Sequence, residues 1–303
     1  MKYLPLFAFV FLMSCLAEQE KKNTVEKKAQ TISVKEEIQA PTVSTSTENI
    51  YPWLENYDIN SALINRFALP EGYKRIEYPK NSMADWLRHL PLKPKGTKVL
   101  LHNGSPKYGN VHEAVVDIDT GKRDLQQCAD AVMRLKAEYH YSRKEYDKIH
   151  FNFTSGDNVK FDDWRQGRKP IIKGNRVAFS AKNNAANNSY SNFKKYMIQI
   201  FTYAGTASLS KELKRISLSD IQPGDVFIQG GFPGHAITVM DVAENAEGKR
   251  IFMLSQSYMP AQDIHILKNP MNGRMSPWYD ADFGASLSTP EWTFEKSDLM
   301  RFR

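Results

Sequence analysis

Hydrophobic positions recur at helical spacing in the middle of the chain. Between Asp124 and Tyr139 the sequence DLQQCADAVMRLKAEY places apolar side chains three to four residues apart, and Asp124 suits an N-cap. The same spacing occurs over Tyr190–Tyr203, and the shorter segment Ser82–Leu90 begins with a serine that suits an N-cap. These patterns predict three helices, with Cys128 in the first turns of the central one.

Shorter apolar runs, bounded by turn residues, predict strands before and after the central helix. The expected strands are Lys98–His102, His112–Asp119, Val226–Gln229, His235–Val242 and Ile251–Tyr258. The segment 162–169 is rich in turn residues, so we expect it to be irregular. Because helices and an antiparallel meander occur in one stretch of chain, we predict an α+β fold.

A short apolar run near the N-terminus stops at Cys15. The run Leu4–Met13 is too short to span a bilayer, and Leu12–Met13–Ser14–Cys15 resembles the lipobox of a bacterial lipoprotein signal peptide. That resemblance implies removal of residues 1–14 and lipid modification of Cys15, whereas an ordinary secretory signal is the alternative. We therefore expect a lipid anchor in a membrane of the bacterial cell envelope, specifically the outer membrane.

Composition divides the remainder of the chain into a tether and a domain. Residues 15–50 are rich in Lys, Glu, Thr and Ser and contain no aromatic residue, which predicts a disordered tether. Such a tether has a reach of roughly 30 Å. Residues 51–303 have the apolar content of a folded protein, and we expect them to form a single globular domain with an N-terminal extension.

Charge and cysteine content narrow the chemistry. The net charge of +7 comes from scattered Lys and Arg residues, without the basic helix or arginine cluster expected of a nucleic-acid-binding protein. The chain has two cysteines, so if Cys15 carries lipid, Cys128 is the single remaining thiol. A buried structural cysteine is the alternative interpretation of Cys128. The histidines lack the spacing of zinc proteases, and we expect neither a metal site nor a cofactor.

Three segments near the C-terminus carry a resemblance to known enzymes. The pattern PGDVFIQ…PGHAITVMDVA…IFMLSQS resembles the strands of papain-like cysteine peptidases and amidases of the NlpC and CHAP types. The resemblance implies a papain-like fold, with a Cys-bearing helix packed on an antiparallel sheet, plus insertions between Cys128 and His235. It also implies that Cys128 is the nucleophile, His235 the base and Gln256 the residue that orients His235. Gln127 is then a candidate for oxyanion stabilisation.

A second resemblance covers nearly the whole of 51–303. The segments LQQCADAVMRLKAEY, GDVFIQGGFPGHAITV and LSQSYMPAQDIHIL are similar to those of an uncharacterised family of bacterial lipoproteins, named only as a domain of unknown function, family 4846. This family brings no known activity.

The residue types nevertheless suit one reaction. A thiolate is a strong nucleophile, and a helix N-terminus favours its formation, whereas a carboxylate such as Asp130 opposes it. The imidazole of His235 can transfer the proton, and the amide oxygen of Gln256 can hold the imidazole. We expect a cysteine hydrolase that acts on peptidoglycan or a related peptide amide. A non-catalytic envelope or glycan-binding module of the same fold remains open, with Cys128 as a core residue.

Overall fold

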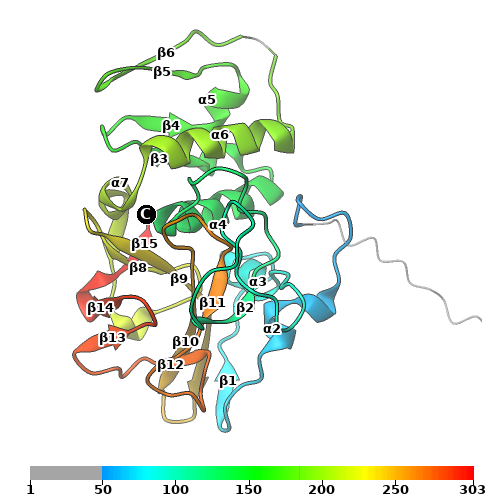
Figure 1. Ribbon diagram of the computed structural model, residues 1–303, viewed down its shortest axis with the longest axis vertical. Coiled ribbons are helices and arrows are strands. Elements are labelled where there is room, and N and C mark those ends of the chain that lie inside the picture. The colour runs from blue at the N-terminus through cyan, green and yellow to red at the C-terminus, as the bar shows by residue number, and fades with distance from the viewer. Residues whose placement is uncertain (1–49, 184) are drawn as a thin grey trace, which may run out of the picture. The chain divides into compact units, whose positions relative to one another are not determined.

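The computed structural model describes residues 50–183 and 185–303 (Figure 1). The predicted signal peptide 1–14, the lipobox with Cys15 and all but the last residue of the predicted tether lie outside the described residues. No helix in the described part is long and apolar enough to cross a membrane.

The described chain forms short helices and many strands. The helices are η1 Ile59–Ser61, α2 Leu63–Arg66, α3 Met83–Arg88, α4 Cys128–Ser142, η2 Tyr146–Lys148, α5 Phe161–Arg165, α6 Tyr190–Tyr203, α7 Thr206–Glu212, η3 Leu218–Asp220 and η4 Lys296–Asp298. The strands are β1 Tyr73–Arg75, β2 His112–Val115, β3 His150–Asn152, β4 Asn158–Lys160, β5 Pro170–Lys173, β6 Arg176–Phe179, β7 Leu213–Arg215, β8 Val226–Gln229, β9 His235–Asn245, β10 Arg250–Gln256, β11 His265–Leu267, β12 Trp278–Asp280, β13 Ser286–Ser288, β14 Thr293–Glu295 and β15 Leu299–Phe302.

One nine-stranded sheet organises these elements. Its order is β2-β11-β10-β9-β8-β15-β7, with β1 also paired to β9 and β12 also paired to β10. Every pairing in this sheet is antiparallel. Three hairpins, β3–β4, β5–β6 and β13–β14, form separate two-stranded sheets. The predicted α+β class, with a large antiparallel sheet, is confirmed.

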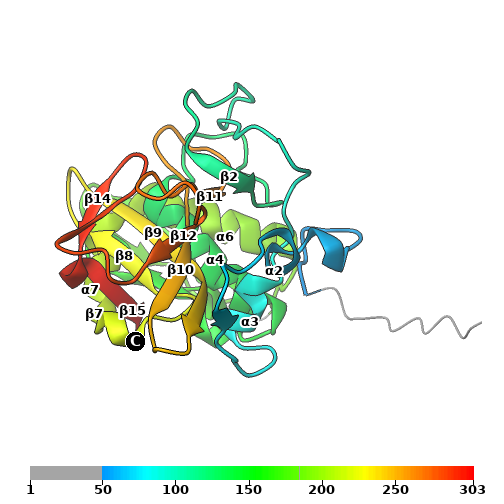
Figure 2. The same ribbon diagram turned by 90° about the horizontal axis from the view of Figure 1, so that it is seen from below.

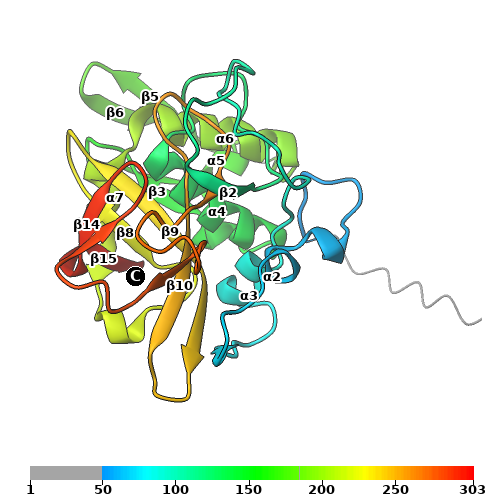
Figure 3. The ribbon, with the colours of Figure 1, turned by 60° about the horizontal axis from the view of Figure 1, so that its bottom comes forward.

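Strand β9 is covered on both faces. Nine consecutive residues from His235 onward are buried, because a strand between two packed layers has no solvent face. Met240 packs in a cluster with Leu135 of α4, whereas Val239 packs in a different cluster with Phe294 of β14. Figures 2 and 3 show β9 between α4 and the hairpin β13–β14. The Cys-bearing helix therefore packs directly on the central strand.

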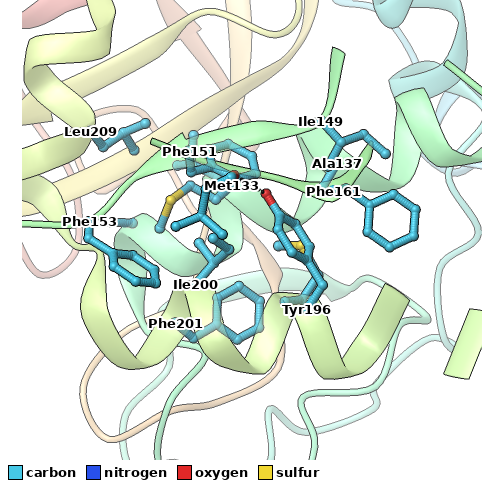
Figure 4. Close-up of a cluster of buried hydrophobic side chains, with 14 of the residues drawn as sticks. Met133, Ala137, Ile149, Phe151, Phe153, Phe161, Tyr196, Ile200, Phe201 and Leu209 are labelled. Carbon is cyan, nitrogen blue, oxygen red and sulfur yellow. Dashed lines mark hydrogen bonds between the residues drawn. The ribbon is translucent and has the colours of Figure 1, made fainter. Parts of the chain in front are cut away.

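A second hydrophobic core lies on the other side of α4 (Figure 4). Met133 and Ala137 of α4 point toward Phe151 of β3, Phe161 of α5 and Ile200 of α6. Residues two apart on a helix point in nearly opposite directions, so α4 buries one face in each core. Burial of each large apolar side chain contributes roughly 1.5–3 kcal/mol. The two cores together hold the start of α4 at a defined place beside the sheet.

The three predicted helices are present, although the central one begins later than expected. Helix α6 has the predicted bounds, and in α3 the Ser82 hydroxyl caps the helix as predicted. Helix α4 begins at Cys128 rather than near Asp124. The carboxylate of Asp130 accepts the N–H of Gln127 at 3.0 Å and so sets the start. Asp124 instead accepts the N–H of Ala261 from a distant loop.

Two other local predictions are wrong. The segment Lys98–His102 forms only isolated bridges to other loops, because its partners are single residues rather than a strand. The segment 162–169, expected to be irregular, overlaps helix α5. Phe161 and Trp164, three residues apart, are both buried in the second core, and this tertiary packing outweighs the turn-forming composition around them.

Candidate functional site

Cys128 is the first residue of α4 and is half-buried. The backbone N–H groups of Ala129 and Ala236 act to lower the pKa of its thiol, against the larger effect of burial. Ala236 is the second residue of β9 and directly follows His235. The fold therefore brings the start of α4 and the start of β9 into contact, although more than a hundred residues separate them in the sequence.

Cys128 and His235 line the same pocket, which has a volume of about 490 Å³. Its walls come from the start of α4, the start of α7, the loop 231–234 and the segments after β10 and β13. Among the described residues that line it, the acidic side chains are Asp124, whose pKa the backbone N–H of Ala261 lowers, and Asp130, whose pKa burial raises well above its ordinary value. The pocket therefore disfavours anionic groups.

Strand register places Gln256 beside His235. Ser255 of β10 pairs with Thr238 of β9, so the next residue, Gln256, lies opposite Ile237 and shares a face with His235. Both side chains are almost completely buried, and Nε2 of His235 lies 2.9 Å from Oε1 of Gln256. The structure thus brings together Cys128, His235 and Gln256, the three residues singled out in the sequence.

The surroundings of Gln256 fix which way its amide points. Its Nε2 donates to a carboxylate oxygen of Glu291 at 2.7 Å and lies 3.3 Å from Nε2 of His265. Nδ1 of His265 lies 2.9 Å from the carbonyl oxygen of Asp263, so Nδ1 donates there and Nε2 accepts. The Gln256 oxygen must then face His235, whose Nε2 carries the proton. The neutral imidazole consequently has an unprotonated Nδ1.

Burial keeps both members of the pair uncharged. It lowers the pKa of His235 to about 4, although the hydrogen bond to Gln256 and the charge of Glu291 act in the opposite direction. Burial also raises the pKa of the Cys128 thiol; backbone N–H groups oppose this shift, and the charge of Asp130 adds to it. The helix N-terminus was expected to favour the thiolate, but the desolvation of Cys128 has the larger effect on its pKa and favours the thiol. Near neutral pH the pair is a thiol beside a neutral imidazole.

Gln127 lies at the edge of the pocket as the residue before α4. Its side-chain Nε2 donates to Asp124 at 3.1 Å. One N–H of this amide is thereby engaged, and the other is available to a ligand. The oxyanion role of Gln127 stays a prediction.

Aromatic and apolar side chains surround the pair. The ring centroids of Tyr258 and Trp292 lie 4.8 and 5.3 Å from that of His235. Phe232 and Met259 line the pocket with 97% and 60% of their surfaces exposed, which is unusual for large apolar residues. None of these four residues was among the site residues expected from the sequence. One signal was available, because Tyr258 follows Gln256 by two residues and so continues the same face of the strand.

The loop before His235 packs tightly against α7. The hydroxyl of Thr206 donates to the carbonyl oxygen of Gly231 at 3.0 Å. A Cβ atom at Gly234 would lie 2.5 Å from Oγ1 of Thr206 and 2.6 Å from the oxygen of Gly231, which leaves no room for a side chain. This close approach fixes where β9 begins and therefore where His235 lies.

The described residues contain no group of three or more His, Cys, Asp or Glu side chains that could hold a metal ion. His102 and His112 each have a buried Nδ1 without a partner in that part of the chain, but no acidic or thiol group joins them in such a cluster.

The comparisons with known proteins define a family but no activity. The model of a family described as "Domain of unknown function (4846)" matches residues 63–301. The chain therefore belongs to this uncharacterised family, as the resemblance in the sequence indicated. No curated protein matches it, and no solved structure matches it.

Proposed function

We propose that this protein is a cysteine hydrolase of the bacterial cell envelope, a peptidase or amidase that cleaves an amide bond in peptidoglycan or a related peptide. One observation carries the proposal. Cys128 and His235 line the same pocket, and His235 has Nε2 committed to Gln256. A thiol and an unprotonated imidazole nitrogen are thus available at one pocket, which is what nucleophilic catalysis by cysteine requires.

A papain-like fold is part of the proposal. The chain order supports it: a helix that begins with Cys128, then an antiparallel sheet in which His235 begins one strand and Gln256 ends the next. The insertion required by this resemblance corresponds to the elements between α4 and β8, which include the second core of Figure 4. Attachment to the outer membrane through lipid on Cys15 completes the proposal.

The first half of the reaction forms an acyl-enzyme. Nδ1 of His235 takes the thiol proton of Cys128 as the sulfur attacks the carbonyl carbon of the amide. Collapse of the tetrahedral intermediate breaks the C–N bond, and His235 gives its proton to the leaving amine. The N–H groups at the start of α4, with the remaining N–H of Gln127, would stabilise the oxyanion.

The second half regenerates the thiol. Water attacks the thioester as Nδ1 of His235 takes one of its protons, the C–S bond breaks, and the proton returns to Cys128. The products are a carboxylic acid and an amine. Because the resting pair is uncharged, proton transfer accompanies each attack, rather than preceding it as in a preformed thiolate–imidazolium pair.

The pocket favours a substrate segment that is neutral or positively charged. Its lining includes the carboxylate of Asp124, whose pKa is lowered, and its rim carries the exposed side chains of Phe232 and Met259. Such a surface suits a peptide with an apolar portion or a free amine. The positive net charge of the chain is carried by residues elsewhere and would favour an anionic wall polymer only at longer range.

The decisive test is hydrolysis of purified peptidoglycan by the full-length Cys15→Ser protein, in which Cys128 is the remaining cysteine. Release of new amino groups, followed by mass spectrometry, measures cleavage. We expect cleavage by this protein, a loss of roughly 10²–10⁴-fold in the His235→Ala variant, and no cleavage by Cys128→Ala. Alkylation of Cys128 in the folded protein should also slow in His235→Ala. A thiol that reacts only after unfolding would contradict the proposal.

The aromatic side chains around the pocket favour one alternative, a non-catalytic glycan-binding module. Tyr258, Trp292 and the exposed Phe232 are residues on which sugar rings can stack. In that case the parent protein and Cys128→Ala bind peptidoglycan equally well, and neither releases amino groups. A sedimentation assay with insoluble peptidoglycan measures this binding.

A further inference from the structure

We infer that Glu291, held by Lys107, is a positioning residue that selects the tautomer of His235. This inference rests on the proposed function, because the selected tautomer has its unprotonated nitrogen available to the Cys128 thiol. Neither Glu291 nor Lys107 belongs to a motif that the sequence makes visible.

The hairpin turn between β13 and β14 brings Glu291 to the site. The N–H of Thr289 donates to the carbonyl oxygen of Trp292 at 2.8 Å, which closes a four-residue turn with Glu291 inside it. One carboxylate oxygen of Glu291 accepts from Nε2 of Gln256 at 2.7 Å. The other accepts from Nζ of Lys107 at 2.6 Å. A continuous chain of hydrogen bonds therefore runs from Lys107 to His235.

The direction of this chain follows from the donors and acceptors. Lys107 can only donate, and a carboxylate paired with it can only accept. Gln256 must therefore turn its NH₂ group toward Glu291 and its oxygen toward His235. An oxygen at that place requires a proton on Nε2 of His235, which leaves Nδ1 as the acceptor. The contact of Gln256 with Nε2 of His265 at 3.3 Å acts in the same direction but is longer.

Substitution by glutamine isolates this directional effect, because Glu291→Gln keeps the shape of the side chain. The introduced amide has one acceptor atom in place of two, and Lys107 will bind it. Its NH₂ group then faces Gln256, which is favoured to turn its own oxygen toward it. His235 would then meet the NH₂ group of Gln256 and move its proton from Nε2 to Nδ1. That tautomer directs a proton, rather than a lone pair, toward the pocket.

The experiment measures the tautomer directly in the full-length chain. Two-bond ¹⁵N–¹H correlation spectra of histidine-labelled protein distinguish the two ring nitrogens, and a His235→Asn variant assigns the signals. We expect Nε2–H in the parent protein and a substantial population of Nδ1–H in Glu291→Gln. A matched control, Glu295→Gln, changes an exposed carboxylate in the adjoining strand β14 and should leave the tautomer unchanged. A tautomer that stays Nε2–H in Glu291→Gln overturns the inference.

A double variant tests the role of Lys107. In Lys107→Met/Glu291→Gln no cation competes for the introduced amide oxygen, which is then free to accept from Gln256. We expect the Nε2–H tautomer to return. A merely structural role for Glu291 predicts the opposite, since loss of a second contact would disturb the site further. Failure of the double variant to restore the tautomer would remove Lys107 from the inference.

Reactivity provides a second readout. We expect alkylation of Cys128 at pH 7 to slow about tenfold in Glu291→Gln, the effect of losing one charge-assisted hydrogen bond, and to recover in the double variant. A tautomer change without any peptidoglycan cleavage by the parent protein would support the positioning role and remove the proposed hydrolysis. Cleavage by the parent protein with no tautomer change in Glu291→Gln would support the proposed hydrolysis and remove the positioning role of Glu291.

Discussion

Strand β9 carries two buried polar groups, His235 at its first residue and Asp241 toward the opposite end, and the two are used in opposite ways. At one end both carboxylate oxygens of Asp241 are engaged by arginines, Nε of Arg75 at 2.6 Å and Nε of Arg88 at 2.5 Å. At the other end His235 has one nitrogen bound to Gln256 and the other free of hydrogen bonds within the described residues. A fully paired group holds the fold together, whereas a partly paired group is available for chemistry.

The Asp241 cluster connects the N-terminal part of the domain to the sheet. Arg75 ends β1, and Arg88 ends α3 and also donates to the carbonyl oxygens of Ile76 and Val242. Each of these charges has lost water, so the cluster is favourable only while every partner is present. At the His235 end the buried groups are neutral, and the charges of Glu291 and Lys107 are partly exposed.

The largest expected effect on stability comes from breaking the Asp241 cluster. Asp241→Asn leaves Arg75 and Arg88 as buried charges without a counter-charge, and we expect a loss of about 3–5 kcal/mol in the free energy of unfolding. Urea denaturation followed by tryptophan fluorescence measures it. The control is Glu244→Gln, which removes a half-exposed ion pair with Arg250 on the same strand and should cost less than about 1 kcal/mol. Equal losses in the two variants would show that the Asp241 cluster is well solvated.

A smaller loss of stability should appear when the pH is lowered, because of the buried histidines at the His235 end of β9. Burial lowers the pKa of His235 to about 4 and that of His265 to about 3. The unfolded chain takes up protons near pH 6.5 and the folded chain does not. Stability is therefore full above pH 6.5 and falls toward the folded pKa, by about 2 kcal/mol per histidine at pH 5.

Urea unfolding at pH 7.5 and pH 5 tests this. The His235→Gln variant should lose about 2 kcal/mol less than the parent protein over that interval. An unchanged pH dependence in His235→Gln would mean that His235 of the parent protein is protonated at pH 5 in the folded state as well as in the unfolded state. The contrast between His235 and Asp241 would then disappear.

The smallest effect on stability is expected at the rim of the pocket. Phe232 is almost fully exposed, so Phe232→Ala should change the free energy of unfolding by less than about 0.5 kcal/mol. If its ring contacts the substrate, KM should rise about fivefold, the effect of losing roughly 1 kcal/mol of binding. Met271→Ala, another exposed apolar residue outside this pocket, is the control. An unchanged KM would exclude Phe232 from the substrate-binding surface.

Local pattern in the sequence was sufficient for much of the fold. Helix α6, the cap of α3 and strand β8 follow from spacing and capping residues, because these signals depend on near neighbours in the chain. The sequence also predicted the α+β class. It predicted that Cys128, His235 and Gln256 share one site, but through a resemblance to known enzymes rather than through physical chemistry.

Tertiary structure decided what depends on distant partners. Helix α4 begins at Cys128 because Asp130 caps it there while Asp124 bonds to the loop at Ala261. Helix α5 forms because the second core buries Phe161 and Trp164. The neutral state of the Cys128–His235 pair is a result of desolvation, which no local motif reveals. Glu291 entered the site because a hairpin turn 35 residues after Gln256 folds back onto β10. Hydrogen-bond direction and burial are properties of the assembled chain, and they determine how this site can react.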